Sequence, residues 1–324
     1  MFTIRDANNS LRSKKICIIG YGNQGRPQAL NLRDSGLLPV IALRDTSPHR
    51  QQVNEDRLVA LPINDALATC DVFVVLIPDE AHADFFNEYV YPTIREGQTF
   101  IFAHGFSVHF NYVDLTKYPV NVGLVAPKGP GTAVRERFLA GEGLPGIIAF
   151  GQDYDGSLRD SVVGYADGIG LLKRGCFETT FREETVTDIF GEQVSLCGGT
   201  IHVMKEAFAT LVDAGFSPEM AYFETIFEMK AIVDLIYTRG ISGMREKISD
   251  TAEFGAYDVI ASLFTDDLKE RMKSRLHDIE NGDFAKRWMS DYRLRKQRLY
   301  ATRKEEKESL VCIVEQEMKE KGLL

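Results

Sequence analysis

Residues 15–25 read Lys15-Ile16-Cys17-Ile18-Ile19-Gly20-Tyr21-Gly22-Asn23-Gln24-Gly25. The apolar, β-branched run that follows the lysines predicts a short buried strand. Gly20, Gly22 and Gly25 then predict a turn that leads directly into a helix. In such a unit the first glycine permits the tight turn, the second lets the backbone approach a pyrophosphate, and the third packs the helix against the strand. The stretch therefore indicates a dinucleotide site at the N-terminus of the helix.

Strands and helices continue to alternate up to about residue 181. A helix over Gln28–Ser35 is closed by Gly36, and the apolar run within Asp71–Pro78 has the composition of a strand buried on both faces of a parallel sheet. Further strands are predicted at Val40–Leu43, Thr99–Ala103, Val122–Val125, Gly146–Phe150 and Cys176–Phe181. The alternation predicts a Rossmann-type, doubly wound α/β domain over residues 1–181.

The segment after the second predicted strand decides which dinucleotide fits. Asp45 lies 20 residues after Gly25, which suits an acceptor for the ribose 2′-hydroxyl of NAD. Its neighbours Arg44, Ser47, His49 and Arg50 are instead donors suited to the 2′-phosphate of NADP. Four potential donors against one acid favour NADPH, with NADH as the alternative.

Polar residues also follow three other predicted strands. Asp79-Glu80-Ala81-His82 comes after the run to Pro78, His104 after Thr99–Ala103, and Lys128 after Val122–Val125. Ligands of parallel sheets bind at the carboxyl ends of the strands, so these residues are candidates for a site. A structural histidine at 104 and a solvated lysine at 128 are the alternatives. The prolines and glycines of the loop over 126–131 favour a fixed, functional lysine.

After Phe181 the pattern changes to successive helices, which predicts an all-helical second domain over residues 182–324. Helices are expected over Glu183–Cys197, over Thr200–Ala214, and from the cap Ser217-Pro218 to Gly240. Ser249 is expected to cap a further helix.

Two pairs of carboxylates lie in these predicted helices, Asp188 with Glu192 and Glu224 with Glu228. A spacing of four residues puts both members of a pair on one helix face, where like charges repel. Hard divalent ions such as Mg2+ take oxygen ligands, and two such pairs can hold two ions roughly 3.5–4 Å apart. Ordinary solvated helix faces are the alternative at this point.

Composition limits the kind of partner. The chain has 324 residues and a net charge of −9, so it offers no electrostatic footprint for nucleic acid. Its five cysteines are scattered without a CxxC spacing, as in proteins of a reducing cytosol. Neither a signal peptide nor a run of ~18 apolar residues is found. We expect a cytoplasmic protein with no nucleic-acid partner and no membrane partner.

Several blocks resemble the ketol-acid reductoisomerases, also called acetohydroxy-acid isomeroreductases, of the short-chain class I family. The similarity runs from about Lys15 to Gly255. It includes GYGNQG, LIPDE, FAHGF, APKGPG, ETTFREET, TDIFGEQ, LCGG, EMAYFE and SDTAEFG.

The resemblance implies a set of site residues. Two Mg2+ ions would be held by Asp188, Glu192, Glu224 and Glu228, with Glu228 acting through water or relaying protons. Ser249 would bind the substrate carboxylate, and His104 and Lys128 would be polar catalytic residues. NADPH would be bound by the glycine turn and by residues that follow strands, namely Tyr21, Gly22, Asn23, Gln24, Arg44, Ser47, Asp79, Glu80, Ala81, His82 and Gly131.

The implied reaction is alkyl migration in 2-acetolactate or 2-aceto-2-hydroxybutyrate, followed by NADPH reduction to the 2,3-dihydroxy acid, in valine and isoleucine biosynthesis. The resemblance also implies a homodimer or a larger homo-oligomer. His49 replaces a small hydroxyl residue, and residues 256–260 and 292–307 depart from the family pattern. The alternatives are therefore a divergent member that reduces another keto acid or an imine, and a non-catalytic dinucleotide-binding protein.

Overall fold

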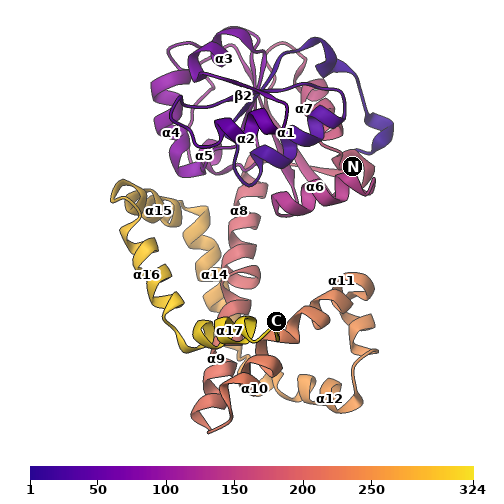
Figure 1. Cartoon of the computed structure of the whole chain (residues 1–324), viewed down its shortest axis with the longest axis vertical. Helices are drawn as coiled ribbons and strands as arrows, with labels where there is room; N and C mark the ends of the chain where they lie inside the picture. The colour runs from indigo at the N-terminus through magenta and orange to yellow at the C-terminus, as the bar shows by residue number, and fades with distance from the viewer. The chain divides into compact units, whose positions relative to one another are not determined.

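The computed structural model describes residues 1–324, apart from the side chain of residue 261. The chain folds into two compact units, Met1–Thr187 and Asp188–Leu324. Figure 1 shows the first from indigo to magenta and the second from pink to yellow. The division falls inside one helix, α8 (Phe181–Gly191).

The first unit is built on one eight-stranded sheet in the order β3-β2-β1-β4-β5-β6-β7-β8. The order reverses between β1 and β4, which is where doubly wound sheets bind their ligands. The strands are β1 Ile16–Ile19, β2 Val40–Ala42, β3 Val59–Leu61, β4 Val72–Val75, β5 Thr99–Phe102, β6 Asn121–Pro127, β7 Gly146–Gln152 and β8 Cys176–Thr179. The Rossmann-type fold predicted from the sequence is confirmed.

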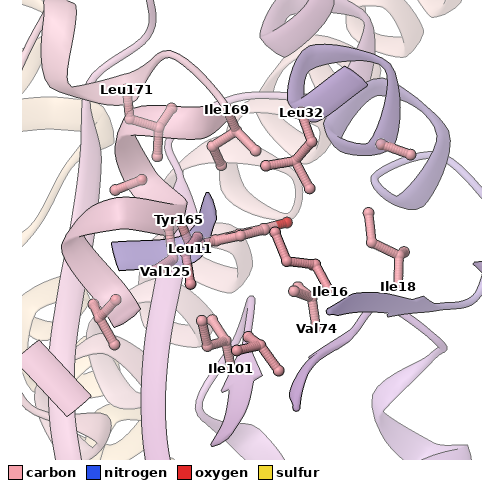
Figure 2. Close-up of a cluster of buried hydrophobic side chains, with 14 of the residues drawn as sticks. Leu11, Ile16, Ile18, Leu32, Val74, Ile101, Val125, Tyr165, Ile169 and Leu171 are labelled. Carbon is pink, nitrogen blue, oxygen red and sulfur yellow. The ribbon is translucent and has the colours of Figure 1, made fainter. Parts of the chain in front are cut away.

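Helices cover both faces of this sheet because successive strand residues point to opposite sides. On one face, Leu32 and Tyr165 pack with Ile18, Val74 and Ile101 (Figure 2). The opposite face carries stacked aromatic rings, including Phe73 and Phe100, whose centroids lie 5.2 Å apart. The α-helices of this unit are α1 Gly25–Asp34, α2 Arg50–Glu55, α3 Ile63–Thr69, α4 His82–Phe85, α5 Phe106–His109, α6 Gly131–Leu139, α7 Leu158–Gly168 and the start of α8.

Two features of the sheet were not predicted. Strand β3 has only three residues, all exposed or half-buried, so the apolar run Leu58–Leu61 that contains it does not stand out as a buried strand. Strand β7 runs antiparallel to β6, whereas every other pair of neighbouring strands is parallel. The β6–β7 segment therefore departs from the simple alternation that the sequence indicated.

The second unit contains α-helices throughout. They are α9 Gly199–Asp213, α10 Pro218–Tyr222, α11 Met229–Arg245, α12 Asp250–Asp258, α13 Ile260–Leu263, α14 Asp266–Glu280, α15 Asp283–Arg293, α16 Gln297–Lys307 and α17 Leu310–Glu320. Its small core joins α9, α10 and α17 through Phe208, Tyr222 and Met318. None of the described helices combines the length and apolarity needed to cross a bilayer.

Two predicted helices of this region contain π turns. The helix expected over Glu183–Cys197 is α-helical only to Gly191 and continues as the π segment η6 (Glu192–Leu196). The segment η7 (Phe223–Phe227) likewise interrupts the helix that begins at the predicted cap Ser217. Both segments pack against α9. Gly240 breaks α11 with φ 75°, so the expected helix end is a kink followed by another helical turn.

Candidate functional site

The glycine turn after β1 has the geometry that its sequence predicts. Gly20 has φ +100°, a conformation that favours glycine. A Cβ on Gly25 would overlap the carbonyl oxygen of Gly20, so only glycine lets α1 start this close to the strand. A Cβ on Gly22 would meet no described atom within 4 Å, which leaves the backbone there open to a ligand. The turn can therefore receive a pyrophosphate at the N-terminus of α1.

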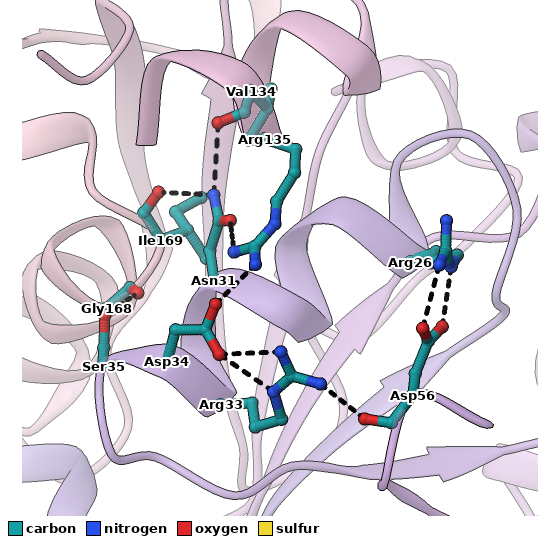
Figure 3. A network of polar contacts seen from close by, with 10 residues as sticks. All are labelled: Arg26, Asn31, Arg33, Asp34, Ser35, Asp56, Val134, Arg135, Gly168 and Ile169. Atoms are coloured by element: carbon teal, nitrogen blue, oxygen red, sulfur yellow. Dashed lines mark hydrogen bonds and ion pairs between the residues drawn. The ribbon is translucent and has the colours of Figure 1, made fainter. Parts of the chain in front are cut away.

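Hydrogen bonds and an ion pair fix the glycine turn in place. The Tyr21 hydroxyl donates to Asp56 at 2.7 Å. Figure 3 shows Arg26, which forms two further contacts with the same carboxylate at 2.6 and 2.8 Å. The hydrogen bond from Arg26 lowers the pKa of Asp56, so the carboxylate stays ionised. On the other side, the Gln24 side-chain amide donates to the Gly129 carbonyl at 3.1 Å. The turn is thus preformed and tied to the loop that carries Lys128.

The loop that carries Lys128 ends at Gly131, where there is no room for a side chain. A Cβ at this position would overlap the backbone oxygen of Asn23. Helix α6, which starts at Gly131, can therefore lie against the glycine turn only because residue 131 has no side chain. Asn23 and Gly131, both predicted cofactor residues, lie next to each other.

A cavity of about 270 Å3 lies at the carboxyl end of β2, where the adenosine ribose was expected. Its lining includes Arg44, Asp45 and Tyr89. Arg50 donates to Asp45 at 2.8 Å and also to the carbonyl oxygens of Leu43 and Arg44. Arg50 is therefore engaged by protein acceptors, while the Asp45 side chain remains 83% exposed.

Ser47 and His49 lie on the turn that follows this cavity. The Ser47 hydroxyl accepts from the backbone N–H of His49 at 3.3 Å. Ser47 is half-buried and His49 is exposed. The serine hydroxyl keeps its own proton for donation to a ligand.

The turn Asp79–Ala81 forms the short helix η3, and His82 then begins α4. The His82 side chain is buried, and its ring nitrogens contact the Ile77 carbonyl at 3.0 Å and the Ser107 hydroxyl at 2.7 Å. Burial lowers the pKa of His82 to about 4, so the ring is neutral at pH 7. The imidazole therefore links the segment after β4 to helix α5, and Glu80 beside it is also buried.

His104 and Lys128 follow the neighbouring strands β5 and β6 and meet at one carboxylate, that of Glu184. His104 Nδ1 lies 3.0 Å from a Glu184 oxygen, and Lys128 Nζ lies 4.0 Å from the same oxygen. The Glu184 side chain is 1% exposed and also accepts the backbone N–H of Gly105 at 2.8 Å. The buried carboxylate thus fixes the tautomer and orientation of His104.

Sequence reasoning did not select Glu184, although it lies within the block ETTFREET. The available signal was positional, since Glu184 precedes Asp188 by one helical turn on the same face of α8. Their carboxylate oxygens lie within 4.8 Å of one another. A Cβ on Gly105 would overlap the Thr185 hydroxyl, so glycine is what lets α8 lie against the His104 loop.

The four predicted metal ligands differ in their surroundings. Asp188 is half-buried on α8, and Glu192 is exposed at the first residue of η6. Glu224 and Glu228 are exposed on and just after η7. Phe227, between them, is 49% exposed, so this helix does leave apolar surface uncovered.

One chain alone does not gather these four carboxylates. Among the described residues, Glu192, Glu224 and Glu228 belong to no group of three potential ligand atoms within 4.8 Å. The π segments η6 and η7 both pack against α9, but the two pairs do not form one cluster of ligand atoms. The spacing of four residues therefore predicts which carboxylates share a helix face. It does not predict that the two pairs come together in one chain.

Ser249 caps α12 as predicted from its position. Its hydroxyl accepts the backbone N–H of Ala252 at 3.2 Å, and the residue is exposed. A hydroxyl that accepts at a cap can still donate its proton, so capping and carboxylate binding are compatible.

The fold and the glycine turn define a dinucleotide-binding protein with an added helical unit. Residues 10–175 match the family model described as acetohydroxy acid isomeroreductase, NADPH-binding domain. Residues 181–322 match the model described as ketol-acid reductoisomerase, C-terminal domain. The chain therefore belongs to the ketol-acid reductoisomerase family, as its sequence resemblance indicated.

Solved structures agree with this assignment. An NADH-preferring ketol-acid reductoisomerase from an uncultured archean is 38% identical, with a TM-score of 0.93 over 98% of each chain. A semialdehyde dehydrogenase NAD-binding protein from Cupriavidus necator is 19% identical, with a TM-score of 0.60 over 82% of this chain and 99% of that one. Pyrroline carboxylate reductase from Plasmodium falciparum is 13% identical, with a TM-score of 0.50 over 84% and 99%. The latter two share the fold alone.

Proposed function

We propose that this protein converts 2-acetolactate or 2-aceto-2-hydroxybutyrate into the corresponding 2,3-dihydroxy acid, as a Mg2+-dependent ketol-acid reductoisomerase of valine and isoleucine biosynthesis. The observation that carries the proposal is the meeting of His104, Lys128 and Glu184 at the carboxyl edge of a dinucleotide-binding sheet. The family assignment supplies the reaction class.

The chemistry of the donor set fits magnesium. Asp188, Glu192, Glu224 and Glu228 offer only carboxylate oxygens, which are the ligands that Mg2+ prefers. When bound, the ions supply Lewis acidity that polarises the substrate ketone and lowers the pKa of the neighbouring hydroxyl. Asp188 is the proposed shared ligand because it follows Glu184 on the same helix face. Glu228 is proposed to act through water or to relay protons.

The nucleotide-binding unit contributes preorganised polar groups. Lys128 carries a positive charge that stabilises negative charge developing on substrate oxygens. His104, held by Glu184, is oriented to hold or move a proton at its Nε2 atom. Ser249, in the helical unit, is proposed to donate a hydrogen bond to the substrate carboxylate.

NADPH is the proposed reductant, supported by the exposed Arg44 and by the donor Ser47. NADH is a second candidate for specific reasons. Arg50 is already engaged by Asp45, and the exposed Asp45 carboxylate can accept from a ribose 2′-hydroxyl. The 38% identical relative is described as NADH-preferring. Comparing Arg44→Ala with wild type decides between them, because loss of a phosphate contact weakens NADPH alone by ~1–3 kcal/mol.

A homodimer or a larger homo-oligomer is proposed to complete the metal centre. The helical unit exposes large apolar side chains, among them Phe227, Tyr237, Ile241 and Phe254. One chain leaves its acidic pairs apart. A second copy that covers this surface could supply the missing carboxylates, and light scattering tests whether a folded monomer exists at micromolar concentration.

The direct test is turnover of the purified protein with 2-acetolactate, NADPH and Mg2+, with the product identified by NMR. We expect the 2,3-dihydroxy acid, and we expect no product when EDTA removes the metal. Consumption of NADPH with an imine or another keto acid, but not with acetolactate, would support the divergent alternative. Dinucleotide binding without any turnover would support a non-catalytic protein.

A further inference from the structure

A second cavity, of about 330 Å3, lies in the nucleotide-binding unit. We call it the α1–α7 cavity, because the C-terminal ends of these two helices form much of its wall. Its lining includes Arg12, Asp34, Leu37, Phe138, Asp167 and Lys173. The volume is at the lower end of the ~300–1,000 Å3 usual for small-molecule sites. Nothing in the proposed reaction uses it.

The two acids of this cavity are in different states. Asp34 is held by Arg33 and Arg135 in the network of Figure 3. Asp167 is half-buried at the end of α7, and within the described part of the chain its carboxylate has no hydrogen bond or ion pair. Burial raises the pKa of Asp167, and the nearby positive charge of Lys173 only partly offsets this. A cation placed beside this carboxylate would relieve its desolvation.

Helix geometry favours a cation at the same place. Asp34 is the last residue of α1, and Asp167 lies in the last turn of α7. The C-terminus of a helix carries partial negative charge, so two converging helix ends attract an ammonium group.

The lining of the cavity also includes two bases and an apolar surface. Arg12 uses its Nε to donate to Asn9 at 2.9 Å, which leaves its terminal nitrogens to contact a ligand. Lys173 places its ammonium 5.5 Å from the centre of the Phe138 ring. Leu37 lies in the same lining. An anion fits beside Arg12 and Lys173, and a small apolar group fits against Phe138.

We propose that the α1–α7 cavity binds a free α-amino acid with a short apolar side chain. Its ammonium group pairs with Asp167, and its carboxylate pairs with Arg12 and Lys173. Its side chain packs against Phe138 and Leu37. A dianion is disfavoured by the two acids, and a simple amine is disfavoured by the two bases, so the charge pattern selects a zwitterion.

The cavity is separate from the dinucleotide site. The glycine turn lies at the N-terminus of α1, whereas Asp34 ends the same helix, which is ten residues long. A helix of that length spans about 15 Å at 1.5 Å per residue. Helix α6 also runs from the glycine turn to the cavity. It begins at Gly131 beside the turn, and Phe138, near its C-terminal end, lines the cavity.

The test is isothermal titration of the full chain with L-valine, in the presence of saturating NADPH and EDTA. NADPH fills the dinucleotide site and EDTA removes metal, so neither feature of the active site can capture the amino acid. 2-Methylpropylamine lacks the carboxylate and 3-methylbutanoate lacks the ammonium group. We expect saturable binding of L-valine, weakened about tenfold or more for each analogue.

Three variants locate the site. Asp167→Asn and Arg12→Gln should each weaken L-valine binding about tenfold, because each removes one charge-assisted contact. Asp160→Asn, an exposed acid on the same helix α7, should not change it. Arg12 is exposed, so Arg12→Gln decides the outcome if Asp167→Asn does not fold.

Several results would overturn the proposal. The first is an absence of saturable binding for glycine, L-alanine, L-valine and L-leucine alike. Equal affinity for L-valine and either analogue would show that a zwitterion is not recognised. L-valine binding that occurs without NADPH but is lost at saturating NADPH would place the binding elsewhere, as would unchanged binding in both Asp167→Asn and Arg12→Gln.

Discussion

The two units handle their carboxylates in opposite ways. In the nucleotide-binding unit, Asp56 and Glu184 each receive several fixed donors, and Glu184 is buried. In the helical unit, Glu224 and Glu228 are exposed beside the half-exposed Phe227. The carboxylates of the first unit are fixed by contacts within that unit, whereas those of the second are exposed, and the proposal is that bound metal organises them. The proposed reaction uses both sets of carboxylates, and each set can be tested separately.

The largest expected effect comes from the second unit. Asp188→Asn should lower Mg2+-dependent turnover of 2-acetolactate more than about a thousandfold, because a shared metal ligand is worth several kcal/mol to every charged step. Reduction of 3-hydroxy-3-methyl-2-oxobutanoate should fall with it. Asp213→Asn, an exposed acid on α9, is the matched control and should remain active. A folded Asp188→Asn protein with near wild-type isomerisation would show that these carboxylates are solvated helix faces.

Acid should destabilise the first unit because the buried side chain of His82 must take up a proton. Burial lowers the pKa of His82 from its usual 6.5 to about 4, so the unfolded chain binds the proton more readily than the folded one. The free energy of unfolding therefore falls as the pH drops from 6.5 towards 4, by about 3 kcal/mol in all. Urea unfolding followed by circular dichroism at pH 7 and pH 5 measures this, with His82→Gln as the comparison. Equal losses in wild type and variant would contradict the assignment.

Magnesium should stabilise the second unit and leave the first unchanged. A ligand at about 100 times its dissociation constant stabilises the folded state by about 2.7 kcal/mol. Hydrogen exchange should show new protection around Asp188–Glu192 and Phe223–Glu228, and little change in the glycine turn. EDTA should reverse it, and Glu224→Gln should reduce it. Protection confined to the nucleotide-binding unit would show that magnesium binds there and not at the carboxylates of the helical unit.

The smallest effect concerns the buried carboxylate of the first unit. Glu184→Gln keeps the shape of the side chain but removes the charge that orients His104, so kcat should fall about ten- to a hundredfold. The change in KM should be smaller, because the residue acts through His104. Glu183→Gln, at the neighbouring exposed position, is the control. An unchanged kcat in a folded Glu184→Gln protein would separate the pair from catalysis.

Local patterns were enough to predict the sheet, because its buried strands are continuous apolar runs and its glycine turn has fixed spacing. The same patterns missed β3, which is short and half-exposed, and could not show that β7 runs antiparallel. The direction of β7 depends on the end of the sheet at which the connection from β6 brings the chain back. The composition of the strand itself does not determine this.

The candidate site divides in a similar way. His104 and Lys128 could be selected because each directly follows a predicted strand. Glu184 was missed, although its place one helical turn before Asp188 was a signal. Its burial against Gly105 is a contact between segments about 80 residues apart, which local patterns do not show. The role of His82 is also clear only from its partners, Ile77 and Ser107. The π turns at Glu192 and Phe223 have no sequence signature as strong as a glycine or a proline.

The position of helix α8 across the boundary between the two units affects where proteases can cleave the chain. The unit boundary at Thr187 lies in the middle of this helix, so the chain crosses it with its backbone hydrogen-bonded. Proteases cleave extended, exposed segments most readily. A protease that separates the halves should therefore attack beyond the helix, near the exposed Cys197-Gly198. The N-terminal fragment released in this way would retain Asp188 and Glu192 together with Glu184.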